Sequence, residues 1–129
     1  MKRLHLIVGA LGVAAFVATG VYMRVWHGGM ESDQQHIRLL LRSRHIYILL
    51  ASLLNLVLAA NYVESDTAWR RRIARFSSAL IVVAPAMLLA AFVRDAAMPE
   101  APGRLVLPAI VTVVAGTFCC LAGGWTARF

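Results

Sequence analysis

The sequence predicts an all-α integral membrane protein, a bundle of four transmembrane helices. First, 60% of its 129 residues are hydrophobic, more than a soluble domain of this size carries, because such a domain needs a polar surface. Second, the charged residues gather in short windows and near the termini, leaving four long uncharged stretches. Third, the tryptophans and tyrosines lie near the ends of these stretches, where the headgroup region favours amphipathic rings: Trp26, Trp69, Trp125, Tyr22, Tyr47 and Tyr62.

The uncharged stretches place the predicted spans at about residues 4–23, 46–63, 76–93 and 105–127. A helix needs about 20 apolar residues, within a range of about 17–25, to cross roughly 30 Å of hydrocarbon. All four stretches fall within this range. The chain is short enough to form one transmembrane domain, 1–129.

The first predicted span follows Lys2 and Arg3, a pattern that a secretory signal peptide shares. Its apolar run is long for a signal peptide, and no convincing A-x-A cleavage motif stands before Arg24. We therefore expect this span to be retained. Small residues recur along it at four-residue spacing, which predicts close packing of helices; they are Ala10, Ala14 and Ala18, and the fourth span has Gly116, Cys120 and Gly124.

The second predicted helix is longer than a membrane requires. Gly28–Gly29 end the first helix, and Ser32 followed by Gln35 has the spacing of a capping box. Nothing stops a helix from there until about Val63, some 30 residues or about 45 Å. Its N-terminal segment is therefore expected either to project from the membrane or to lie along its surface.

A polar stripe follows this second helix. At 100° per residue, Arg44, Asn55 and Tyr62 lie near one face, with His45 and Ser52 on its flank. An amide in the middle of a membrane is costly unless it is paired, so Asn55 is expected to bond either to another helix or to a ligand. Arg44 and His45 stand at the interface, where they either reach headgroups or contribute to a binding site.

Prolines mark the remaining two spans. Pro85 lies in the middle of the third span and predicts a kink. Pro108 lies in the first turn of the fourth, where proline is tolerated. The segment 98–103 contains two prolines and a glycine and predicts a tight connection between the two helices.

The net charge of +7 comes from basic residues beside the spans, which indicates contact with the lipid bilayer and its anionic headgroups rather than with nucleic acid. Four spans place both termini on one side, with seven Lys and Arg against six on the other. The dense arginine cluster and the basic N-terminus favour cytoplasmic termini, and the compact loops suit a bacterial inner (plasma) membrane. The candidate headgroup-binding residues are Arg38, Arg42, Arg70, Arg71, Arg72 and Arg75.

Histidines are the candidate ligands for a metal or a haem, namely His27, His36 and His45. A b-type haem needs two imidazoles on different helices at one depth. His5 and His45 begin successive spans at opposite faces of the membrane, and His36 lies about 180° from His45 on a continuous helix. Only pairs that include His27 remain, so the simplest expectation is no cofactor.

Other chemistry has little support in the sequence. No acid or base lies inside a predicted span away from its ends, which argues against an ion-coupled transporter with a buried carboxylate. Neither a phosphate-binding loop nor a nucleophile elbow is present, and no catalytic residue is predicted. Cys119 and Cys120 are adjacent, so they are poorly placed for a disulfide.

Three functions remain open from the sequence. The first is a non-enzymatic subunit, assembly factor or lipid-interacting protein, which forms homo-oligomers or joins a larger membrane complex. The second is a haem- or metal-binding redox module built on the histidines of the first loop. The third is a permeation path for a small solute along Ser52, Asn55 and Tyr62.

Overall fold

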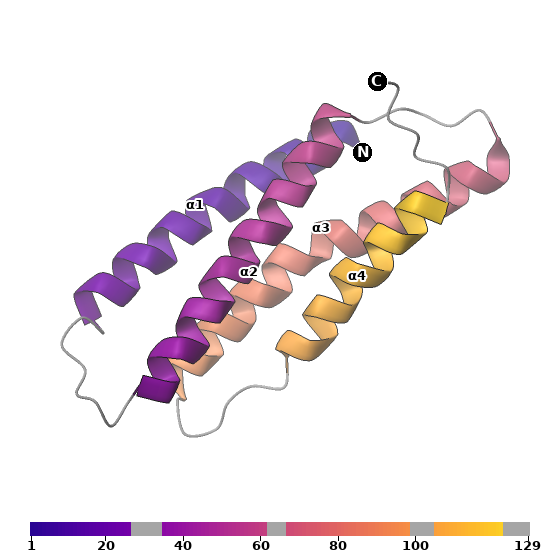
Figure 1. Ribbon diagram of the computed structural model, residues 1–129. Helices are drawn as coiled ribbons and strands as arrows, with labels where there is room; N and C mark the ends of the chain where they lie inside the picture. The colour runs from indigo at the N-terminus through magenta and orange to yellow at the C-terminus, as the bar shows by residue number, and fades with distance from the viewer. Residues whose placement is uncertain (27–34, 62–66, 99–104, 123–129) are drawn as a thin grey trace.

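The structure, a computed structural model, describes residues 1–26, 35–61, 67–98 and 105–122. These residues form four helices that run side by side with alternating directions (Figure 1). α1 packs on α2, α2 on α3 and α3 on α4, and α1 also touches α3. The predicted all-α four-helix bundle is confirmed. The helices are α1 (Lys2–Trp26), α2 (Gln35–Ala60), α3 (Ala68–Ala97) and α4 (Val106–Ala122).

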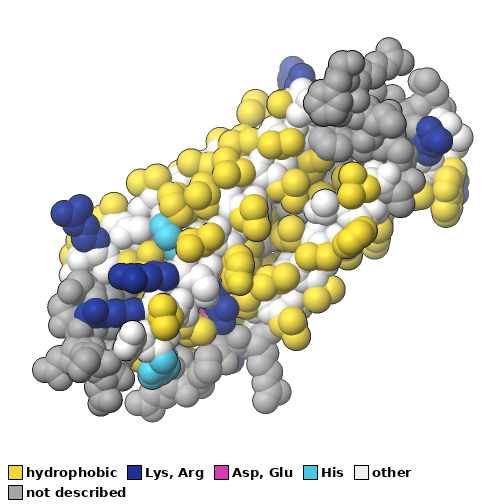
Figure 2. All heavy atoms as spheres, viewed as in Figure 1, with side chains coloured by type: hydrophobic (Ala, Val, Ile, Leu, Met, Phe, Trp, Pro, Cys, Tyr) yellow, Lys and Arg dark blue, Asp and Glu magenta, His cyan; other side chains and the backbone are white. Residues whose placement is uncertain are grey.

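Three of the helices, α1, α2 and α3, are long and apolar enough to cross a membrane, and α4 is a shorter apolar helix of 17 residues. Figure 2 shows hydrophobic side chains over the middle of the visible face, with lysines and arginines towards its two ends. This distribution matches a layer of hydrocarbon between two layers of headgroups. The chain is a small multi-span helical membrane protein. Residues 123–127 of the predicted fourth span lie outside the described residues, so a fourth crossing remains a prediction.

The predicted extension of the second helix is present. α2 begins at Gln35, eleven residues before the predicted span, and ends at Ala60, slightly before the predicted end. Its 26 residues span about 39 Å at 1.5 Å per residue, more than the hydrocarbon thickness. The N-terminal turns continue the helix along the bundle, as Figure 1 shows, rather than bending to lie across its end.

Helix packing follows the spacing of buried residues. On α3 the buried positions recur every three or four residues from Ser77 to Asp95, so they form one face of the helix. Leu88 and Phe92 of this face join Ile48 of α2 and Ala109 of α4 in one hydrophobic cluster. The opposite faces carry exposed leucines, valines and phenylalanines, which suit contact with lipid.

The predicted packing stripe on α1 does not pack within the chain. Ala10, Ala14 and Ala18 are all exposed, so packing of this stripe between copies stays a prediction. Glycines on another face of α1 make the close approach instead: a Cβ atom on Gly9 would lie 2.7 Å from Leu56 Cγ, and one on Gly12 would lie 2.9 Å from Ser52 Cβ. Since real Cβ atoms do not come so close to such neighbours, α2 can occupy this position only where α1 has no side chain.

On α4 the predicted stripe does pack against a neighbour at its two described positions. A Cβ atom on Gly116 would lie 2.7 Å from Ile81 Cγ1 and 3.3 Å from the Ser77 carbonyl oxygen of α3. Cys120, one turn further, contacts the Ser77 hydroxyl. Gly124, the third member, lies outside the described residues.

Candidate functional site

Pro85 leaves one backbone carbonyl of α3 without its usual hydrogen bond. Proline has no backbone N–H, so the Ile81 carbonyl four residues earlier loses its helical partner. Asn55 of α2 supplies a replacement: its Nδ2 donates to the Ile81 oxygen at 3.0 Å and to the Ala51 oxygen of its own helix at 2.9 Å. A neighbouring helix therefore satisfies the carbonyl, which could not remain bare in hydrocarbon.

Asn55 also joins α1. Its Oδ1 lies 2.8 Å from His5 Nδ1, and both side chains are fully buried. Because the two bonds from Nδ2 identify Oδ1 as the oxygen, His5 must donate through Nδ1. Asn55 thus bonds to α1 through one end of its amide and to α3 through the other.

A second set of contacts at the same end of the bundle joins α3 to α4. Ser77 Oγ donates to the Gly116 carbonyl oxygen at 2.6 Å and lies 2.6 Å from Cys120 Sγ. Ser77 stands one turn from Ile81 on the buried face of α3. We use the name Asn55 layer for the set that links all four helices in this way: His5, Asn55, the Ile81 carbonyl, Ser77, Gly116 and Cys120.

The opposite half of the bundle contains a buried ion pair. Arg44 Nε of α2 donates to Asp95 Oδ2 of α3 at 2.9 Å, and their side chains are 11% and 0% exposed. This finding corrects the expectation that no buried carboxylate exists. The sequence reading ended the third span at residue 93, but α3 continues to Ala97 and turns Asp95 towards α2.

His45, next to Arg44, faces α1 instead. Its Nδ1 lies 2.8 Å from Thr19 Oγ1, and its ring stacks on Phe16 with a centroid separation of 3.9 Å. Thr19 donates its hydroxyl hydrogen to the Phe16 carbonyl at 2.9 Å, so His45 Nδ1 acts as the donor to Thr19. Arg44, Asp95, His45 and Thr19 form what we call the Arg44 layer, which joins α1, α2 and α3.

An apolar groove of about 460 Å³ lies between α1 and α3 at the level of the Arg44 layer. Carbon atoms make up nearly all of its lining. Tyr22 and Phe92 meet edge to face across it, with ring centroids 6.1 Å apart. The lining residues are Ala15, Ala18, Thr19 and Tyr22 of α1 and Leu89, Phe92, Val93, Ala96 and Ala97 of α3.

The structure divides the predicted polar stripe between several partners. Arg44 faces α3, His45 faces α1, and Asn55 bonds to both. Ser52 is fully buried where Gly12 approaches, and its hydroxyl donates to the Ile48 carbonyl of its own helix. Tyr62 lies outside the described residues.

The predicted metal ligands do not converge in the described part of the chain. His36 is exposed near the start of α2, and His45 is engaged with Thr19. His27 lies outside the described residues. Across residues 1–26, 35–61, 67–98 and 105–122, no three His, Cys, Asp or Glu side chains form a cluster that could hold a metal ion.

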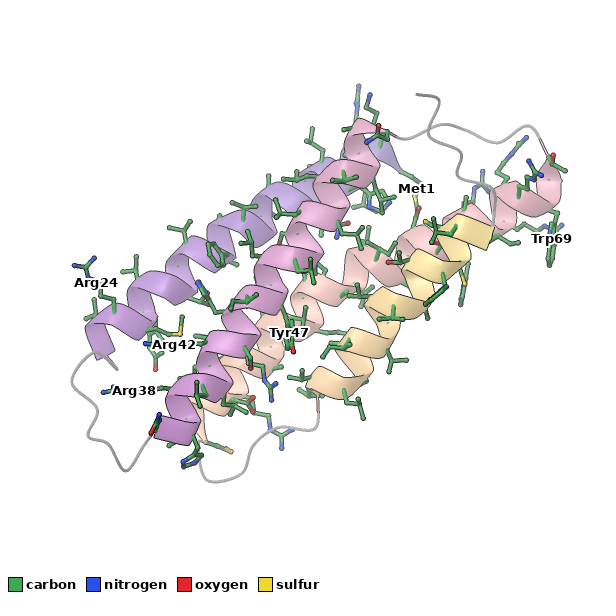
Figure 3. The ribbon with its side chains drawn as sticks, in the orientation of Figure 1. Met1, Arg24, Arg38, Arg42, Tyr47 and Trp69 are labelled. Atoms are coloured by element: carbon green, nitrogen blue, oxygen red, sulfur yellow. The ribbon has the colours of Figure 1, made fainter. Side chains whose placement is uncertain are left out.

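The predicted headgroup-binding arginines separate into two groups at opposite ends of the bundle. Arg38 and Arg42 lie with Arg24 at one end, and Trp69 marks the other (Figure 3). The cluster at the second end is fully exposed on the first turns of α3: Arg70, Arg71, Arg72 and Arg75. Both groups therefore lie where headgroups would meet the protein.

Sequence reasoning missed four side chains of the two layers: His5, Thr19, Ser77 and Asp95. His5 was placed at the start of a span and given no partner, Thr19 and Ser77 were not singled out, and Asp95 lay beyond the predicted end of the third span. A periodicity argument could have found all four, because His5, Gly9, Gly12 and Thr19 share one face of α1, and Ser77 and Asp95 belong to the buried face of α3.

Comparisons of the chain with protein-family models, with curated proteins and with solved structures find no match.

Proposed function

We propose that this protein is a non-enzymatic, lipid-interacting membrane protein that holds a lipid acyl chain in the groove between α1 and α3. The groove is the observation that carries the proposal. It opens on the surface of the bundle, where Ala18 and Val93 of its lining are exposed, and its lining is almost entirely carbon. An acyl chain is the most abundant apolar ligand at that depth of a bilayer.

The polar atoms near the groove support an apolar ligand. Thr19 is one of two hydroxyl-bearing residues in the lining, and its oxygen already contacts the Phe16 carbonyl and His45. A polar solute would find few free hydrogen-bond partners there, so the groove would bind such a solute only weakly.

Charges at the ends of the bundle extend the same interaction to headgroups. Exposed arginines flank the apolar middle, and basic residues at this depth attract anionic lipids at about 1 kcal/mol each. Trp69, 68% exposed beside the arginine cluster of α3, fits the interfacial layer. We place the protein in a bacterial inner membrane with both termini cytoplasmic.

The geometry favours neither alternative function. Asn55 and Ser52 use their polar atoms in contacts between and within helices, which leaves little for a solute path. Of the histidines that the redox alternative uses, His36 is exposed near the start of α2 and His45 is engaged with Thr19, so these two do not converge. A visible spectrum of the purified protein tests the redox alternative directly, because bound haem gives a Soret band.

Native mass spectrometry of the protein released from mild detergent tests the groove. Ala18→Phe fills the groove from an exposed position on α1, and Ala14→Phe adds the same ring at an exposed position outside the lining. We expect lipid retention to fall roughly tenfold in Ala18→Phe, the effect of losing about 1.4 kcal/mol of chain burial. Ala14→Phe is expected to retain lipid like the wild type.

Equal lipid retention in the wild type and Ala18→Phe would contradict the acyl-chain proposal. A helix from a partner subunit or from a second copy is a different occupant of the same groove. The masses distinguish it, because a bound lipid adds only a small fraction of the 14.1 kDa of the chain, while a second copy doubles the mass.

A further inference from the structure

Arg44 is held in place through only part of its guanidinium group. The group has five N–H donors in a planar fork. Its Nε donates to Asp95 Oδ2, and neither Nη atom donates a hydrogen bond to any residue that the structure describes. The side chain is nevertheless only 11% exposed. Four donors therefore stand at the surface on an arginine whose position is fixed.

The contact with Asp95 leaves a particular edge of the guanidinium open. Arginine and a carboxylate often pair through two parallel hydrogen bonds, which would occupy Nε together with one Nη. Here the ion pair uses Nε alone. The edge formed by the two Nη groups is free to receive two oxygens of another anion, and phosphate has the matching geometry.

The charges near Arg44 favour an anion over a cation. Asp95 neutralises Arg44 itself, but the described residues at this end of the bundle include three exposed or half-exposed arginines on α1 and α2 and one on α3: Arg24, Arg38, Arg42 and Arg94. Counted along the sequence, the segments that meet at this end carry six arginines and four acids. The charge there is positive on balance, so an approaching phosphate group is attracted.

We propose that Arg44, positioned by Asp95, binds a phosphate group through its two Nη groups at the membrane interface. Asp95 holds the guanidinium and does not touch the ligand. Arg44 and Asp95 are absent from the lining of the α1–α3 groove, so this site stands or fails independently of the acyl-chain proposal. A lipid headgroup and free inorganic phosphate both offer the required chemistry.

Three variants separate phosphate binding from a purely structural ion pair. Asp95→Asn leaves the Arg44 guanidinium without its counter-ion, so a bound phosphate should stabilise this variant more than it stabilises the wild type. The double variant Arg44→Gln/Asp95→Asn removes both charges of the pair. Arg42→Gln is the matched control, because Arg42 is an exposed arginine two residues away on the same helix.

The measurement is the melting temperature of each protein in dodecyl maltoside, a detergent without phosphate, used alone, with phosphatidylglycerol, or with inorganic phosphate. We expect Asp95→Asn to melt below the wild type in the detergent alone and to recover when a phosphate source is added. Wild type and Arg42→Gln should be stabilised to similar extents by the same source. The double variant should bind that source roughly tenfold more weakly than the wild type.

The phosphate source that restores Asp95→Asn identifies the ligand. Recovery with phosphatidylglycerol alone assigns a lipid headgroup, and recovery with inorganic phosphate in the detergent assigns a soluble phosphate. If neither source restores Asp95→Asn, or if the double variant responds as strongly as the wild type, the pair is structural and the proposal is wrong.

Discussion

A proline in one helix leaves a backbone carbonyl without a hydrogen bond, and an asparagine on the neighbouring helix supplies that bond. Pro85 removes the hydrogen bond of the Ile81 carbonyl, and Asn55 restores it from α2. The asparagine gains as well, because its amide would otherwise be unpaired in hydrocarbon. Each of the two residues alone would weaken the bundle, and together they connect α2 to α3.

Asn55→Ala is expected to destabilise the bundle by about 1–2 kcal/mol, because it removes hydrogen bonds to His5 and to the Ile81 carbonyl, each worth about 0.6 kcal/mol with a maximum near 1.7. Unfolding in mixed detergent monitored by circular dichroism measures the change. Asn61→Ala is the control, since Asn61 is exposed and bonds only to the Val57 carbonyl of its own helix.

A double-mutant cycle that combines Asn55→Ala with Pro85→Ala tests the role of Pro85. In Pro85→Ala the new backbone N–H can bond to the Ile81 carbonyl, so the hydrogen bond from Asn55 becomes less important. The cost of Asn55→Ala should then shrink by roughly 0.5–1 kcal/mol in the Pro85→Ala background. Equal costs in both backgrounds would show that Asn55 does not compensate for the proline.

The sequence predicted single residues better than it predicted their partners. Asn55 was expected to turn inward and Pro85 to disturb its helix, since both conclusions follow from local chemistry. Their contact depends on how α2 and α3 are aligned, which no local pattern determines. Asp95 was missed for a different reason: the predicted spans were ended at charged residues, so a charge inside a helix was excluded from the start.

At the scale of the helix, α1 and α2 approach through glycine. His5, Gly9, Gly12 and Thr19 lie on the face of α1 that meets α2, with polar contacts at its ends and glycines between them. Small residues on α1 occur on two faces at similar spacing, and the sequence interpretation chose the alanines. Only the positions of His5 and Thr19, which need partners, distinguish the buried face.

Gly12→Ala is expected to destabilise the bundle by about 1–3 kcal/mol, the usual cost of forcing an extra methyl group into a packed interface. The new Cβ atom would lie 2.9 Å from Ser52 Cβ, so α1 must move away from α2, whereas its distance of 3.7 Å to Pro85 Cβ is an ordinary van der Waals contact. Ala14→Val, which adds carbon on an exposed face of the same helix, is the control for bulk alone.

Relief of the contact at Ser52 gives a stricter test of this interface. Ser52→Gly removes both atoms that the new methyl group meets on α2. Adding it to Gly12→Ala should recover part of the lost stability, although glycine itself costs roughly 1 kcal/mol in a helix. If Gly12→Ala melts like the wild type, the close approach of α1 and α2 is not important for stability.

At the scale of the whole molecule, the hydrogen bonds between helices that we describe lie in two layers, separated by mostly apolar residues. α2 belongs to both: Asn55 contributes to one layer, and Arg44 and His45 contribute to the other, about 15 Å away along the helix. The sequence could predict four helices and an apolar middle, because both follow from the solvent. The two layers depend on which helices are neighbours, so they appeared only with the structure.

The positions of the helices predict that both termini lie on the cytoplasmic side. α1 begins and α4 ends at the same end of the bundle, where α3 also carries its four exposed arginines (Figure 1). Basic residues near span ends are retained in the cytoplasm, and this end has seven Lys and Arg against six at the other. Green fluorescent protein fused to either terminus should fluoresce, and alkaline phosphatase at the same positions should be inactive.

Replacing Arg70, Arg71 and Arg72 with glutamine lowers the count at this end to four against six, so part of the population should invert and gain phosphatase activity. An active phosphatase at the C-terminus alone of the unchanged protein would mean that α4 does not cross the membrane, and activity at both termini would reverse the orientation.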